Sequence, residues 1–67
     1  MNIHFNNQPQ QIPADTALQL MLNNLIGDKQ QGIAVAINDT VIPRLQWAAH
    51  VLQPDDNVLV ITATQGG

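Results

Sequence analysis

The sequence predicts an α+β roll, in which one helix packs across one face of a mixed sheet of four to five strands. Three observations predict this fold. The first six residues alternate between apolar and polar side chains, a central segment carries leucines at helical spacing, and two Val- and Ile-rich apolar runs follow. The 67 residues, which lack cysteine, are expected to form one domain, 1–67, with an aliphatic core and no disulfide.

The amino-terminal segment is predicted to be a hairpin. Within residues 1–6, Ile3 and Phe5 share one side of a strand, and polar residues occupy the other side. Residues 6–9, which combine asparagines with a proline, predict a turn. Residues 10–12 then return as a short second strand.

The helix is predicted within residues 13–27. Thr16 and Gln19 stand at the spacing of a capping box, and Asp15 is an alternative N-cap. Gly27 is expected to end the helix in a left-handed conformation. One face of this helix is apolar, with residues at i, i+3, i+4 and i+7: Leu18, Met21, Leu22 and Leu25.

Residues 32–38 form a continuous apolar run that predicts a strand buried on both faces. After a turn, residues 41–43 predict a short edge strand, where Pro43 removes no ladder hydrogen bond. Residues 44–52 have mixed periodicity and are expected to form a helical turn and a connector.

The last strand, residues 58–64, is apolar on both faces and is therefore expected to lie centrally in the sheet. An acidic turn precedes it, in which an aspartate takes the strained backbone position. Val58 and Val60 are expected under the helix. Leu59 and Ile61 then point to the opposite face, beside His4, where this short chain has nothing to cover them.

The charge balance excludes some classes of partner. Two basic residues, Lys29 and Arg44, stand against five aspartates, which gives a net charge of −3. Nucleic acid is therefore an improbable partner, because no basic patch can neutralise phosphates. No apolar run has the length of a membrane span or the pattern of a signal peptide, so a cytoplasmic location is expected.

The residues of the chain do not predict a catalyst. Nucleophilic catalysis needs an activated Ser, Cys, Thr or Lys, yet Ser and Cys are absent, and Lys29 falls in a polar loop. His4 and His50 are the only imidazoles, and without Cys or Glu they do not make a zinc site. A turn explains Asp55 and Asp56 better than a cation site. We therefore expect no enzyme activity, no metal and no bound cofactor.

The sequence ends in Gln65, Gly66 and Gly67, and residues 64–67 are predicted to be a flexible tail. A Gly-Gly end has no Cβ atoms, so it can enter a narrow channel and adopt whatever backbone conformation a receiving site needs. Its carboxylate could be activated by ATP bound to another protein. The domain itself would then need no catalytic residue.

Nearly the whole sequence resembles the ThiS family, the small sulfur carriers of thiamine biosynthesis, and the specific motifs lie from about residue 35 onward. The resemblance lies in the stretch "VAIN", in the order Pro43-Arg44-x-x-Trp47, in the acidic turn before the last strand and in the Gly-Gly end. The family often has Gly-Asp at that turn, where this chain has Asp55-Asp56.

The resemblance implies a ubiquitin-like β-grasp fold and a carrier function. In the family, a ThiF-type adenylating enzyme uses ATP to activate the terminal glycine, which is Gly67 here. Sulfur that originates from a cysteine desulfurase then replaces the adenylate and leaves a thiocarboxylate. Thiazole synthase takes this sulfur for the thiazole ring of thiamine. Gly67 would be the modified residue, and Gly66 and Gln65 would give it reach.

Four residues are candidates for docking to these partners: Leu59, Ile61, His4 and Arg44. Leu59 and Ile61 qualify because an exposed aliphatic patch on a small protein often marks a partner site. Arg44 either pairs with a nearby aspartate or contacts a partner, whereas Trp47 is interpreted as core packing.

Three alternatives stay open from the sequence. One is the small subunit of molybdopterin synthase, which is also a β-grasp sulfur carrier that ends in Gly-Gly. Another is a protein modifier that forms isopeptide bonds with lysines. The third is an interaction domain whose terminal glycines are incidental.

Overall fold

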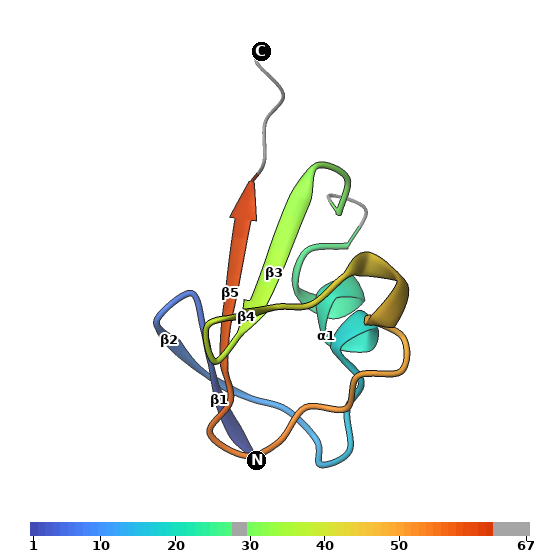
Figure 1. The fold of residues 1–67 in the computed structure, drawn as a ribbon. Coiled ribbons are helices and arrows are strands. Elements are labelled where there is room, and N and C mark those ends of the chain that lie inside the picture. Colours follow the sequence, from blue (N-terminus) through green and yellow to red (C-terminus); the bar gives the residue numbers. More distant parts are fainter. Residues whose placement is uncertain (28–29, 63–67) are drawn as a thin grey trace.

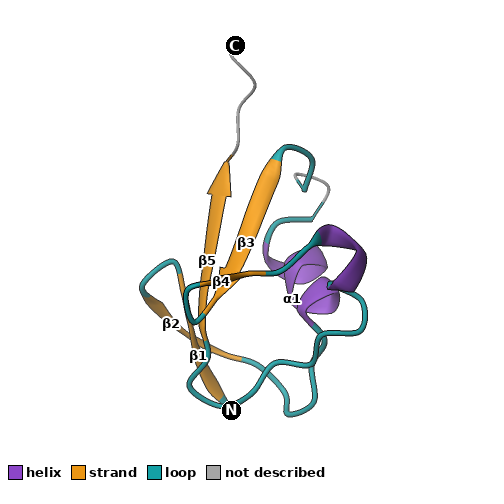
Figure 2. Cartoon of the chain, viewed as in Figure 1, coloured by secondary structure: helices purple, strands orange, loops and turns teal. Residues whose placement is uncertain are grey.

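The computed structural model describes residues 1–27 and 30–62, and within them one helix lies against one face of a five-stranded mixed sheet (Figures 1 and 2). The strand order is β2-β1-β5-β3-β4. The central strands β1 and β5 run parallel, and the other neighbours are antiparallel. The predicted α+β roll is confirmed. Its elements are β1 (Asn2–Phe5), β2 (Gln8–Gln11), α1 (Leu18–Leu25), β3 (Ile33–Ile37), β4 (Thr40–Val41), the 3-10 helix η1 (Arg44–Gln46) and β5 (Asn57–Thr62).

Both hairpins close through two-residue turns in which asparagine begins the turn. Asn6 and Asn7 have φ of 50° and 67°, and Asn38 and Asp39 have φ of 51° and 70°. Positive φ at both central residues is what a type I′ hairpin turn requires, and asparagine tolerates it. The first turn is shorter than predicted, so β2 begins at Gln8 rather than two residues later.

The predicted side-chain cap of the helix is wrong. Helix α1 begins at Leu18, its N-cap is Ala17, and no side chain in the described part of the chain caps it. The hydroxyl of Thr16 instead donates to the carbonyl oxygen of Pro13 at 2.6 Å. The first helical amides find partners in a distant loop, where the carbonyl of His50 accepts from Leu18 and that of Trp47 accepts from Gln19. A tertiary contact thus replaces the local cap. At the other end, Gly27 has a φ of 66°, as predicted.

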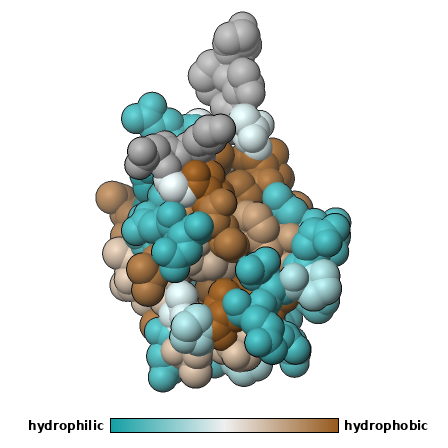
Figure 3. Space-filling view, turned by 180° about the vertical axis from the view of Figure 1, so that it is seen from behind, coloured by the Kyte–Doolittle hydropathy of each residue, from teal (hydrophilic) through white to brown (hydrophobic). Residues whose placement is uncertain are grey.

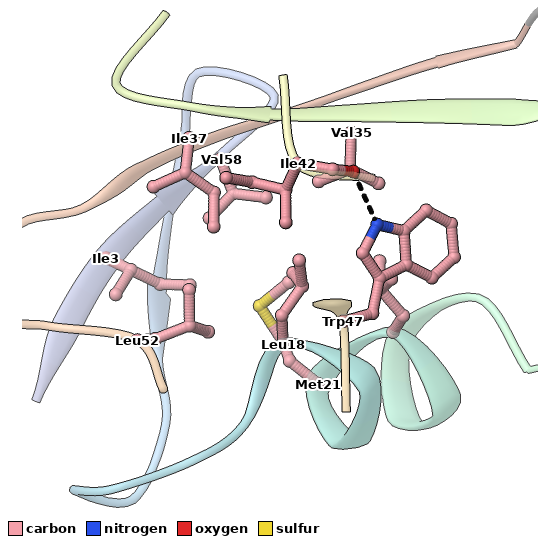
Figure 4. Close-up of a cluster of buried hydrophobic side chains, with 10 residues drawn as sticks. Ile3, Leu18, Met21, Val35, Ile37, Ile42, Trp47, Leu52 and Val58 are labelled. Atoms are coloured by element: carbon pink, nitrogen blue, oxygen red, sulfur yellow. Dashed lines mark hydrogen bonds between the residues drawn. The ribbon is translucent and has the colours of Figure 1, made fainter. Parts of the chain in front are cut away.

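The core lies between α1 and the sheet (Figure 4). Leu25 was expected there but is 38% exposed, because it is the last helical residue and Ile26 packs against the core instead. Trp47 is 1% exposed, and its indole N–H donates to the carbonyl oxygen of Ile42 at 2.8 Å. The interpretation of Trp47 as core packing is confirmed. The buried apolar side chains are Ile3, Leu18, Met21, Leu22, Val35, Ile37, Ile42, Trp47, Leu52 and Val58.

Strand β3 is buried on one face, not on both as predicted. Val35 and Ile37 are buried under α1, whereas Ala34 and Ala36, on the other face, are only partly buried. No second layer of the described chain covers that face. Strand β5 is central, as predicted, with Val58 buried beneath the helix layer and Val60 partly buried beside it.

Candidate docking face and carrier end

The sheet face opposite α1 carries an apolar patch over β3, β4 and β5. On β5, Leu59 is 41% exposed and Ile61 is 52% exposed. Their partners across the ladder are Ala36 and Ala34 on β3, and Val41 on β4 pairs with Ala36. We call these five residues the open-face patch. Figure 3 shows apolar surface adjoining the end of β5. The two alanines keep the centre of the patch low, so the branched side chains of β4 and β5 border it.

His4 lies on the same face, as predicted. It is exposed on β1 and pairs with Asn57 of β5, two residues before Leu59. Partners in a ladder share a face of the sheet, so His4 forms the polar border of the open-face patch. The structure thus brings His4, Leu59 and Ile61 together on one surface.

Arg44 does not join this group. It lies in η1, on the helix side of the molecule, where its guanidinium donates to the carbonyl oxygen of Gln30 at 2.6 Å. The same guanidinium stands 4.8 Å from the centroid of the Trp47 ring, a cation–π arrangement. These contacts fix Arg44 on a surface separate from the open-face patch.

The acidic turn is structural, as expected. Asp55 has a φ of 68°, the strained position that the sequence predicts for an aspartate. The Asp56 carboxylate is buried and accepts hydrogen bonds from the Gln53 backbone N–H at 2.8 Å and from the Asn38 side-chain Nδ2 at 3.0 Å. These bonds join the turn before β5 to the β3–β4 turn, so Asp56 anchors the start of the central strand.

The predicted reactive end, Gln65, Gly66 and Gly67, lies outside the described residues, and so does the predicted tail, 64–67. The described chain ends with β5 at Thr62, at the opposite end of the molecule from the amino terminus (Figure 1). The open-face patch includes Leu59 and Ile61, so it lies on the strand that leads directly into the last five residues of the sequence.

Sequence reasoning missed Val41, Ala34 and Ala36 as parts of the patch. The alternation of alanine with Val35 and Ile37 was a usable signal, because small residues on one parity indicate a strand with only one covered face. Val41 is 67% exposed, but its face depends on the β3–β4 register, which the sequence does not show.

Within residues 1–27 and 30–62, no three His, Cys, Asp or Glu side chains gather where they could hold a metal ion. In the same part of the chain, no helix has both the length and the apolar character to cross a bilayer.

The chain has close sequence relatives. The family model described as the ThiS family matches residues 3–67. The sulfur carrier protein ThiS of Escherichia coli K12 is 39% identical over 67 residues, which cover 100% of both chains. A thiazole synthase of Magnetococcus marinus is 37% identical over 67 residues, which are 100% of this chain and 20% of that protein.

Solved structures share the fold. The crystal structure of the thiamine biosynthesis protein ThiS from Geobacter metallireducens has a TM-score of 0.87 and 22% identity, covering 100% of both chains. A solution structure of a thiamine biosynthesis protein from that organism has a TM-score of 0.76 and 22% identity, covering 100% of this chain and 88% of that one. The fold is the ubiquitin-like β-grasp that the resemblance implied. Together with the full-length sequence match, this establishes that the chain belongs to the ThiS family.

Proposed function

We propose that this chain is a sulfur carrier in thiamine biosynthesis, and that the carboxylate of Gly67 is its working group. The observation that carries the proposal is the end-to-end match to the E. coli sulfur carrier, over 100% of both chains. The family match also runs through residue 67, so it includes the Gly-Gly end. The domain supplies the scaffold, and the chemistry occurs at the terminal carboxyl carbon.

The proposed reaction has two steps, both performed by partner enzymes. A ThiF-type adenylating enzyme binds ATP, and the Gly67 carboxylate attacks the α-phosphorus, which forms an acyl-adenylate and releases pyrophosphate. In the second step, the outer sulfur of a persulfide, carried by a donor that a cysteine desulfurase supplies, displaces AMP to give an acyl disulfide, and a thiol then reduces its S–S bond to leave a thiocarboxylate and a disulfide. A C–O bond is exchanged for a C–S bond, so the carbon is neither oxidised nor reduced.

In this proposal the chain is a carrier and not an enzyme. It binds no cofactor of its own, because ATP belongs to the adenylating enzyme. The cytoplasm, where ATP and reduced sulfur are available, is the proposed location.

Thiazole synthase is the proposed acceptor of the sulfur. Supporting this, a protein named thiazole synthase in M. marinus contains a segment 37% identical to the whole of this chain, equal to 20% of its length. A carrier-like segment and a thiazole synthase in one polypeptide are what direct transfer between the two would favour. This observation also favours thiazole formation over the molybdopterin alternative.

The open-face patch is the proposed docking surface for the adenylating enzyme, with His4 at its border. Leu59 and Ile61 stand on β5, close to the point where the chain continues toward Gly67. An enzyme that receives the last residues must come close to the end of β5, where the exposed apolar side chains lie on the open face. Arg44, on the helix side, is proposed as a separate partner contact.

Intact mass measurement tests the proposed function. The full chain is incubated with ATP, a ThiF-type adenylating enzyme and a sulfur donor. A mass gain equal to the exchange of one oxygen for one sulfur is expected. Covalent conjugates of higher mass would instead indicate a modifier, and an unchanged mass with several adenylating enzymes would indicate an interaction domain.

Leu59→Asp is expected to weaken binding of the adenylating enzyme by at least about tenfold, because it places a charge within an apolar contact. Leu59 is already 41% exposed, so the melting temperature should fall by only a few degrees. Titration calorimetry and thermal melting measure the two effects.

Leu45→Asp is the matched control. Leu45 is 96% exposed and lies in η1, away from the open-face patch. It should leave both binding and melting nearly unchanged. A large loss of stability in Leu59→Asp, or an equal loss of binding in both variants, would contradict docking through this face.

A further inference from the structure

Among the described residues, the last part of β5 has a neighbouring strand on one side only. Strand β3 pairs with β5 from Val58 to Thr62. On the other side, β1 pairs only with Asn57 and Val58, and the chain then turns at Asn6. Figure 1 shows β5 continuing past the β1–β2 hairpin toward its end. Within residues 1–27 and 30–62, nothing pairs with the other edge of Val60–Thr62, which we call the free edge of β5.

The hydrogen bonds show which backbone groups face this free edge. The Asn6 N–H donates to the carbonyl of Val58 at 2.9 Å, and the Val60 N–H donates to the Asn6 side-chain oxygen at 2.7 Å. Backbone groups alternate sides along a strand, so the Val60 carbonyl and the Thr62 N–H and carbonyl face the same way. Among the described residues, nothing bonds to the Val60 carbonyl or to the Thr62 N–H.

Asn6 determines where this free edge begins. Its side-chain carbonyl takes the place of a strand residue opposite Val60 and ends the ladder between β1 and β5. Beyond it, the edge runs toward the end of β5. Unpaired strand edges are templates for pairing with another chain.

The two outer edges of the sheet are poorer templates. On β2, Pro9 lacks an N–H, and β4 is two residues long and is followed closely by Pro43. The edge at Val60–Thr62 has no proline, and it is continuous with the segment that leads to Gly67.

We propose that the ThiF-type adenylating enzyme adds an extended backbone segment to the free edge of β5, pairing with the Val60 carbonyl and the Thr62 N–H. This inference rests on the proposed function. Five residues follow Thr62, and even fully extended they span at most about 18 Å. The ATP site must therefore come close to the end of β5, and the enzyme's surface must lie beside it.

Pairing at this edge would set the register of the delivered segment. Main-chain hydrogen bonds supply affinity in strand addition, whatever the side chains are. If a strand of the enzyme pairs with Val60–Thr62, the last five residues leave the sheet at a defined point and in a defined direction relative to the enzyme. The segment that carries the carboxylate then loses less conformational entropy when it binds beside ATP. The open-face patch and this edge would act together, one through side chains and the other through the backbone.

Amide hydrogen exchange tests the pairing in the unmodified chain. Purified carrier is measured alone and with saturating ThiF-type adenylating enzyme, without ATP. The Thr62 amide is expected to exchange at least about tenfold more slowly in the complex. The Ile61 amide faces β3 and should be protected in both states. The Gln11 amide faces the outer edge of β2, since its neighbour Ile12 donates inward to Met1, and should be unprotected in both.

Backbone N-methylation at Thr62, introduced by chemical synthesis, tests the energetic role. It removes the donor and blocks the edge, so the enzyme should bind about tenfold more weakly. N-methylation at Gln11 is the matched control and should leave binding unchanged. Thermal melting verifies that both synthetic chains fold.

The results of these experiments distinguish failure of the edge-pairing proposal from failure of the proposed sulfur-carrier function. Sulfur loading of the unmodified chain tests the function alone. If that chain is loaded, but Thr62 exchanges equally fast with and without enzyme, or the Thr62-methylated chain binds as tightly, the inference is overturned. Protection of Thr62 that rises with carrier concentration without enzyme would assign the edge to a second copy, and would also overturn it.

Discussion

Appending one alanine after Gly67 is expected to lower sulfur loading by at least about a hundredfold while leaving the domain folded. The extra residue moves the carboxylate about 3.3 Å further from the end of β5 and adds a Cβ atom to a segment that has none at its last two positions. Adenylation needs the carboxylate oxygen in line with ATP, so a displacement of this size removes the reacting geometry. Intact mass after loading measures the loss.

An appended glycine is the matched control for the alanine. It adds the same length without the Cβ atom. Equal losses of sulfur loading in the two variants would show that the position of the carboxylate matters. A smaller loss with glycine would show that the width of the receiving channel matters. Both variants should melt at the temperature of the unmodified chain. Full loading of the alanine variant would contradict the role assigned to Gly67.

Trp47→Ala is expected to have the largest effect on stability, about 3–5 kcal/mol. The indole is 1% exposed, fills the space between α1 and the sheet, and satisfies the Ile42 carbonyl oxygen. Its loss leaves a cavity and an unpaired carbonyl, and it removes the ring on which Arg44 lies. In a domain of this size the melting temperature should fall by more than about 12 °C, as measured by circular dichroism.

Two further substitutions show whether the loss of stability comes from the buried indole of Trp47. Trp47→Phe retains most of the packing but lacks the N–H donor, so it should cost about 1–3 kcal/mol. Leu45→Ala changes a side chain that is 96% exposed and should cost less than about 0.5 kcal/mol. If Trp47→Ala melted like Leu45→Ala, the assignment of Trp47 to the core would be wrong.

The elements that depend on local patterns were predictable. The alternation around Ile3 gave the first strand, the leucine spacing gave α1, and the doubly apolar run around Val60 gave the central position of β5. The positive φ of Asp55 also followed, because the residue types that tolerate it are few. These are short-range effects, which a single sequence displays directly.

Features that depend on distant contacts could not be predicted. The amides of Leu18 and Gln19 bond to carbonyls about 30 residues away, so a capping pattern around Thr16 gave the wrong cap. The bond from the Val60 N–H to the Asn6 side chain spans 54 residues. Nothing local to either residue indicates it, although it defines the free edge of β5.

In the proposed function, sulfur is carried on the main-chain carboxyl carbon of Gly67 by a domain that performs no chemistry itself. The most direct test is to digest the loaded chain with trypsin, which cleaves after Lys29 and Arg44, and to weigh the fragments. The oxygen-to-sulfur mass gain should appear only in fragment 45–67, and further fragmentation should place it at the last residue. A gain in either of the other two fragments, or on a side chain within 45–67, would contradict the claim.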